Sequence, residues 1–178
     1  MRFVPLPVHG AYLVELEELG DERGFFARAF DVDQFAALGL RTEVKQCNYS
    51  FNHVRGTVRG LHYQVPPATE AKLVRCISGA IWNVIVDLRP DSPTWLQRSA
   101  VELSTANRRA LYAPDLCAVG YQALEDGTAV YYQVSEVYTP SAERGIRWND
   151  PRLGIEWPLP VSAISPKDEA WPLMDVES

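Results

Sequence analysis

From residue 42 onward the sequence is a succession of short β-type segments separated by turn signals. The segments are rich in Val, Ile, Thr and Tyr, and clusters such as Pro90-Asp91-Ser92-Pro93 and Glu125-Asp126-Gly127 interrupt them at fairly regular intervals. We expect strands at 43–51, 57–64, 72–77, 80–89, 96–103, 109–113, 120–124 and 129–137. So many short strands with so little helix predict an all-β sandwich, jelly roll or barrel.

The N-terminal part predicts two further strands and one helix. Residues 3–19 alternate weakly and favour an opening strand, and residues 25–30 favour another. Asp31 is placed to cap a short helix that runs to Leu38, with Gln34 as its capping-box partner and Gly39 ending it. The expected buried side of this helix is Val32, Phe35, Ala36 and Leu38.

The bulk properties bound the class of protein. With 178 residues we expect one domain, residues 1–178, long enough to bury about 70% of its unfolded surface. A net charge of −6 without a basic tract argues against nucleic acid and anionic membrane as partners. There is no run of roughly 18 apolar residues and no apolar leader. Three cysteines without metal-binding spacing predict reduced thiols and a cytoplasmic location.

The segment 52–79 concentrates residues with chemical potential. His62 and Lys72 lie on two predicted strands joined by a proline turn, so both can face the interior of one barrel. Arg59 has the opposite parity to His62. Only a bulge, which Gly60 permits, would direct both side chains inward.

Local pattern alone leaves several alternatives open. Tyr132 and Tyr138 share parity and can both face such a pocket, although strand tyrosines are mostly packing residues. A lone strand histidine is more often structural than catalytic. A metal site needs about three ligands, and the position two after His62 is Gln64 rather than a second histidine. These observations predict a β-barrel with a possible His, Lys and Tyr pocket, and no metal.

Longer motifs are more specific. RGLHYQ, KLVRCISG, VDLRPDSPTW, ERGIRWNDP and GIEWP occur in this order, and the chain resembles the dTDP-4-dehydrorhamnose 3,5-epimerase family, the RmlC-type cupins, from about Asp21 to Asp168. The resemblance implies a cupin double-stranded β-helix (jelly roll) with one or two short helices. We expect this single domain to comprise N-terminal strands over 1–51, a barrel core over 52–140 and a C-terminal arm over 141–178. The resemblance also implies a homodimer and a cofactor-independent isomerase.

The activity that the resemblance implies is inversion of the centre or centres beside the ketone of a dTDP-4-keto-6-deoxy sugar. His62 then matches the base, Asp168 the carboxylate that orients it, Tyr132 the proton donor and Lys72 the group near the ketone oxygen. Imidazole is a suitable base near neutral pH, and a fixed cation stabilises an enolate. The expected substrate-binding residues are Arg23, Gln46, Asn48, Arg59, Tyr138, Glu143 and Lys167.

The chain departs from the family pattern near the substrate. The family's proline loop usually ends in Gly-Phe-Ala-His-Gly-Phe, whereas residues 114–121 read PDLCAVGY, with Val119 at the histidine position. Arg28 stands where a nucleotide-contacting glutamate is common, and Cys47 and Asn83 each replace a usual aspartate. We therefore expect a change in the nucleotide, the sugar or the number of inverted centres, with a 3,5-, 3- or 5-epimerase all compatible.

Two other classes of function stay open at this point. The altered loop favours a non-catalytic cupin that binds a nucleotide sugar, whereas the retained base, acid and lysine argue against it. A metal-dependent cupin oxygenase is the third alternative.

Overall fold

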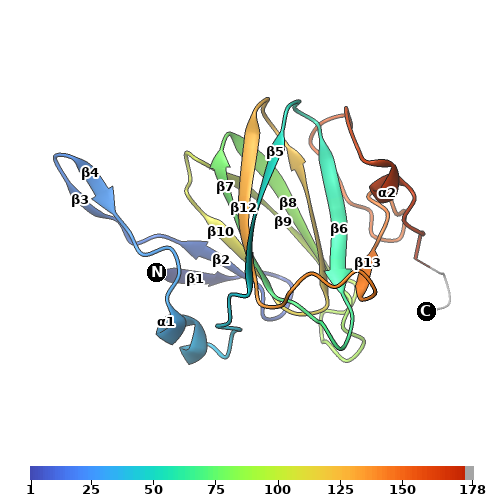
Figure 1. The fold of residues 1–178 in the computed structure, drawn as a ribbon, viewed down its shortest axis with the longest axis horizontal. Helices are drawn as coiled ribbons and strands as arrows, with labels where there is room; N and C mark the ends of the chain where they lie inside the picture. The colour runs from blue at the N-terminus through green and yellow to red at the C-terminus, as the bar shows by residue number, and fades with distance from the viewer. Residues whose placement is uncertain (175–178) are drawn as a thin grey trace.

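Two antiparallel sheets face each other and form a jelly-roll barrel in the computed structural model, which describes residues 1–174 (Figure 1). The six-stranded sheet has the order β1 (Arg2–Pro5), β2 (Tyr12–Glu15), β10 (Ala110–Ala113), β7 (Lys72–Ser78), β12 (Thr128–Val134), β5 (Gln46–Asn52). The five-stranded sheet has the order β13 (Glu143–Gly145), β6 (Val58–Gln64), β11 (Cys117–Ala123), β8 (Ala80–Asp87), β9 (Arg98–Ser104). The fold class predicted from the sequence is confirmed.

All eight strands expected after residue 42 are present, as β5 to β12. The clearest case is β8, which is buried on both faces and therefore reads as a nearly continuous apolar run. Ile81 and Ile85 belong to the cluster inside the barrel, whereas Val84 and Val86 pack on the outside. The partners of these two valines include Leu153 of the C-terminal arm.

The C-terminal arm lies along the outer side of the five-stranded sheet, and its short helix contacts β6 (Figure 1). It contains the helix α2 (Pro166–Glu169), which is capped by the side chain of Ser165 and starts with a proline, as helix N-termini favour. The last four residues of the predicted arm, 175–178, lie outside the described residues. None of the helices within residues 1–174 is long and apolar enough to cross a lipid bilayer.

The N-terminal strand predictions were only partly right. The expected strand over 3–19 is divided into β1 and β2, which pair with each other, and β3 (Leu19–Asp21). The expected strand over 25–30 ends early, as β4 (Gly24–Phe26), because Phe30 turns away to pack against Phe35 with ring centroids 4.8 Å apart. Figure 1 shows the β3–β4 hairpin projecting away from the barrel.

The predicted helix is α1 (Val32–Ala37), and Asp31 caps it by accepting a hydrogen bond from the backbone of Gln34 at 3.1 Å. The capping box is not formed, because the Gln34 side chain instead accepts a hydrogen bond from the N-terminal amine of Met1. The predicted buried side was largely wrong: Phe35 alone is buried, and Val32, Ala36 and Leu38 are exposed. So short a helix presents only one side chain to the aromatic cluster beside the barrel.

Candidate active site between the two sheets

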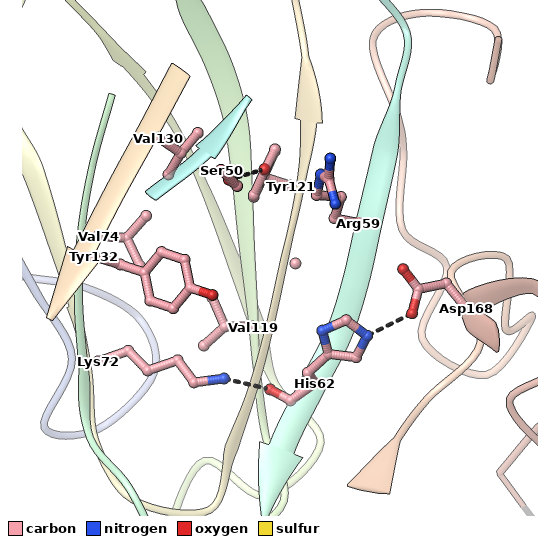
Figure 2. Close-up of a pocket in the computed structure, with 11 residues that line it drawn as sticks. Ser50, Arg59, His62, Lys72, Val74, Val119, Tyr121, Val130, Tyr132 and Asp168 are labelled. Atoms are coloured by element: carbon pink, nitrogen blue, oxygen red, sulfur yellow. Dashed lines mark hydrogen bonds and ion pairs between the residues drawn. The ribbon is translucent and has the colours of Figure 1, made fainter. Parts of the chain in front are cut away.

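A cavity of about 160 Å³ opens between the two sheets, and both sheets line it. β6 and β11 supply one wall, and β5, β7 and β12 supply the other. The walls carry all four residues that the sequence assigned to the chemistry: His62, Lys72, Tyr132 and Asp168 (Figure 2). The rest of the lining combines three valines, Val74, Val119 and Val130, with the polar side chains of Ser50, Arg59 and Tyr121.

His62 is held by a carboxylate from the C-terminal arm. The Nε2 atom of His62 lies 2.5 Å from Oδ1 of Asp168, and Oδ2 of Asp168 accepts the backbone N–H of Gly60 at 3.2 Å. Burial alone would raise the pKa of Asp168, but these hydrogen bonds and the nearby imidazole hold that pKa below its usual range. Because Nε2 faces the carboxylate, the other ring nitrogen, Nδ1, faces the cavity (Figure 2).

A bulge in β6 brings Arg59 and His62 to the same cavity. His62 lies opposite Val119 of β11, but Arg59 lies opposite Tyr121, so three steps along β6 match two along β11. Gly60 has φ +102°, and a Cβ there would lie 2.7 Å from the carbonyl oxygen of Val119. The bulge that the sequence required is therefore present, and it depends on a glycine.

Lys72 is anchored beside His62. Its Nζ atom donates to the carbonyl oxygen of His62 at 3.2 Å and lies 3.0 Å from Oε1 of Glu70, and the Lys72 and Glu70 side chains are both largely buried. An ammonium group has three N–H donors, so two anchors leave one for a ligand. Glu70 was not predicted from the sequence, where its only signal is its place two residues before Lys72.

Tyr132 faces His62 from the opposite sheet (Figure 2). Burial is the main cause that raises the pKa of its phenol, and Tyr121 and Glu70 raise it further, against a smaller opposing effect of Arg59. The phenol is therefore protonated throughout the physiological pH range and is available as a proton donor.

A second group of predicted residues meets in a hydrogen-bonded cluster that does not line this cavity. Gln46 accepts the backbone N–H of Tyr138 at 2.7 Å, and the Tyr138 hydroxyl donates to Glu143 at 2.7 Å. Lys167 donates to both carboxylate oxygens of Glu143, at 2.7 and 2.6 Å. Burial opposes ionisation of Glu143, but Lys167 and Tyr138 more than offset it and lower its pKa.

Gln46 and Asn48, two of the expected substrate-binding residues, belong to a longer polar face of β5. Asn48 pairs in register with Tyr132, and Gln46, Asn48, Ser50 and Asn52 alternate with exposed residues along the strand. Ser50 lines the cavity, and Asn52 is buried behind it. Sequence analysis named the first two of these residues and missed the last two, although the period of two continues without a break.

Arg23 is not brought to the cavity within one chain. It sits in the turn of the β3–β4 hairpin, 88% of its side chain is exposed, and it pairs with Asp21. Arg28 is also exposed and pairs with Asp31 at 3.5 Å, next to α1.

Of the three other residues that depart from the family pattern, Val119 lines the cavity, Asn83 lies behind it and Cys47 lies away from it. Val119 is buried and lines the cavity directly. Cys47 is exposed on the outer face of β5, away from the interior. Asn83 is buried and donates to the carbonyl oxygen of Gly120 at 2.8 Å, so it supports the strand that carries Val119.

Metal ligands are not assembled in the described part of the chain. Within residues 1–174, no group of three or more His, Cys, Asp or Glu side chains is arranged to hold a metal ion.

In this all-β fold an imidazole, a phenol and an ammonium group converge on one cavity. The family description dTDP-4-dehydrorhamnose 3,5-epimerase matches residues 5–175. The chain is 42% identical over 173 residues to the dTDP-4-dehydrorhamnose 3,5-epimerase of Methanothermobacter thermautotrophicus, covering 96% of this chain and 92% of that protein. It is 38% identical over 170 residues to the dTDP-4-dehydrorhamnose 3-epimerase of Streptomyces niveus, covering 95% of this chain and 82% of that protein.

Solved structures agree with the sequence comparisons. The crystal structure of dTDP-4-dehydrorhamnose 3,5-epimerase from Bacillus anthracis with TDP and PPi bound superimposes with a TM-score of 0.92 at 38% identity, covering 97% of this chain and 99% of that one. The chain belongs to the dTDP-4-dehydrorhamnose 3,5-epimerase family and is an isomerase.

Replacing Gly60 with alanine tests how strongly the bulge positions the site. The added Cβ meets backbone atoms of β11, so Gly60→Ala should destabilise the fold by about 2–5 kcal/mol and displace His62. Gly127→Ala is the matched control, because its φ is +69° but its nearest neighbour is 3.9 Å away, and it should cost about 1–2 kcal/mol. Denaturant unfolding measures both values. Equal costs for the two variants would show that the close approach of β6 and β11 is not a constraint.

Proposed function

We propose that the chain inverts the centre or centres beside the ketone of a dTDP-4-keto-6-deoxy sugar by proton transfer between His62 and Tyr132. The observation that carries the proposal is the placement of an imidazole and a phenol on opposite walls of one cavity, with a lysine ammonium beside them. All steps use side chains of the chain itself, without a metal or an organic cofactor.

His62 is the base in this proposal. The hydrogens on carbons 3 and 5 of the sugar are acidified by the ketone between them, and Nδ1 of His62 faces the space where a sugar would lie. The carboxylate of Asp168 fixes the tautomer and stabilises the imidazolium that forms when the proton is taken.

Lys72 stabilises the resulting enolate. Proton removal places negative charge on the oxygen at carbon 4, and the one N–H of Lys72 not used by His62 and Glu70 can donate to it. Anchoring the ammonium in advance means that little reorganisation is needed when the charge develops. A sugar that fills the cavity would displace water from it, which would strengthen this interaction.

Tyr132 returns a proton to the other face of the ring. A proton returned by His62 would restore the original configuration, so inversion needs a second donor on the opposite side. The raised pKa of Tyr132 keeps its proton in place until the carbanion forms. Arg59, which projects from the same wall as His62, is suited to the diphosphate, because a guanidinium binds phosphate oxygens in pairs.

The number of inverted centres is part of the proposal. The relatives include both a 3,5-epimerase and a 3-epimerase at similar identity. Val119 lies directly opposite His62 and offers no hydrogen bond to the sugar, which supports an altered specificity. The non-catalytic binding alternative is not favoured, because acid, base and cation are all assembled and the named relatives are epimerases.

Removing either proton-transfer group should abolish turnover without removing binding. We expect His62→Ala and Tyr132→Phe each to lower kcat by about 100-fold or more, since general acid and base groups contribute effects of this size. Affinity for dTDP should change less than about twofold in both variants. Proton NMR of the products and calorimetric titration measure the two quantities. Wild-type turnover in either variant would contradict its assigned role.

We also propose a homodimer in a cytoplasmic setting, where the three free thiols would stay reduced. The hairpin exposes Leu19, Phe25 and Phe26, which is an unusual apolar surface for an isolated chain. A second chain would cover it and give Arg23 a pocket to reach, because the hairpin points away from its own barrel (Figure 1).

Solution mass tests the dimer. Light scattering should give twice the 20.0 kDa of one chain, and Phe26→Asp should shift the population toward monomer. Leu173→Asp is the control, because Leu173 is also exposed but lies in the C-terminal arm, and it should leave the mass unchanged. A wild-type protein of 20 kDa at all concentrations would exclude the dimer.

A further inference from the structure

Two hydroxyl groups form a pair in the wall of the cavity, apart from the groups used for proton transfer. Oγ of Ser50 lies 2.7 Å from the hydroxyl of Tyr121, and both residues line the cavity (Figure 2). Ser50 comes from β5 and Tyr121 from β11, so the pair bridges the two sheets. Tyr121 is only 7% exposed.

Asn52 fixes the direction of hydrogen bonding behind this pair. Its Oδ1 must be the atom that faces Nε of Arg59 at 2.8 Å, because a guanidinium can only donate. Its Nδ2 must be the atom that faces the carbonyl oxygen of Thr128 at 3.1 Å, because a carbonyl can only accept. The amide orientation is therefore determined on both sides.

This orientation decides how Tyr121 uses its hydroxyl. Nδ2 of Asn52 donates its second hydrogen to the Tyr121 oxygen at 3.3 Å. Tyr121 then has two possible acceptors, Oγ of Ser50 at 2.7 Å and Oδ1 of Asn52 at 3.4 Å. The second is long and already accepts from Arg59, so Tyr121 donates to Ser50.

Ser50 is left with a hydrogen that has no acceptor among the described residues, where Tyr121 is its one side-chain partner. Burial is the main cause that raises the pKa of Tyr121, so the phenol stays protonated and the direction of donation does not change over the physiological pH range. The free O–H of Ser50 is therefore available to a ligand that enters the cavity.

We propose that Tyr121 is a positioning residue for substrate recognition, which holds Ser50 so that its hydroxyl donates to a hydroxyl oxygen of the sugar ring. The inference rests on the proposed function. A sugar oxygen is the partner because Ser50 lines the same cavity as His62 and Tyr132, where the reacting ring must lie. The three valines of the cavity, Val74, Val119 and Val130, offer no hydrogen bond to such a group.

In the series of hydrogen bonds from Arg59 through Asn52 and Tyr121 to Ser50, each residue donates to the next. The series begins at a cation suited to phosphate and ends at a hydroxyl suited to the sugar. Each donor in the chain polarises the next, which strengthens donation at the Ser50 end. Binding of the diphosphate and orientation of the sugar are thereby linked through fixed groups.

Calorimetric titration with dTDP-glucose and with dTDP separates the sugar contact from the nucleotide contacts. dTDP-glucose carries the ring hydroxyls without the ketone, and dTDP lacks the sugar. We expect Tyr121→Phe and Ser50→Ala each to weaken dTDP-glucose binding about tenfold and to leave dTDP binding within about twofold. The double variant should be no weaker than either single variant, because the two groups act as one unit. With the 4-keto substrate, KM should rise in Tyr121→Phe while kcat stays within about twofold.

Three results would overturn the inference. The first is Tyr121→Phe with unchanged affinity for dTDP-glucose while Ser50→Ala weakens it. The second is additive losses in the double variant, and the third is an equal loss for dTDP and dTDP-glucose. Wild-type protein that binds neither nucleotide would instead contradict the proposed function itself, so the two failures are distinguishable.

Discussion

The hydrogen bond between Asp168 and His62 is the contact on which the rest of the site depends. It spans 106 positions in the sequence and joins the C-terminal helix α2 to β6 in the barrel wall. The carboxylate is buried, yet the imidazole and the Gly60 N–H keep its pKa low, so it stays charged beside the ring. The C-terminal arm therefore contributes to the candidate site, because Asp168 holds the imidazole with Nδ1 facing the cavity.

The jelly roll supplies what an inversion needs, namely two walls that face each other. In the proposed mechanism the base belongs to the five-stranded sheet, and the acid and the lysine belong to the six-stranded sheet. A substrate placed between them would meet the base on one face and the acid on the other. The Ser50 and Tyr121 pair joins the same two sheets. The proposed sugar recognition and the proposed proton transfer therefore use side chains of the same two walls. A different side chain in these walls, such as Val119 opposite His62, would alter which sugar or which centre is positioned for reaction.

Much of this could be predicted from the sequence because strands and turns have distinct compositions and strands alternate their faces. β-type segments separated by turn signals located β5 to β12, and the opposite parity of Arg59 and His62 required the bulge that Gly60 provides. The N-terminal hairpin was harder, because its residues have strand character but no partner in the barrel. Asn52 and Tyr121 were missed because their roles arise from contacts between distant strands, and Glu70 was missed because its place two residues before Lys72 is a weak signal. Asp168 had no local signal, and only the family resemblance indicated it.

The most direct test of the central claim is proton NMR in heavy water with the dTDP-4-keto-6-deoxy sugar. In wild-type protein, signals at carbon 3, carbon 5 or both should disappear with inversion, and their number identifies the epimerase as single or double. In Tyr132→Phe, His62 should still exchange the same hydrogens with solvent, but the configuration should be retained. In His62→Ala neither exchange nor inversion should occur. Inversion that persists in Tyr132→Phe, or exchange at the wild-type rate in His62→Ala, would contradict a mechanism with a base and an acid on opposite walls.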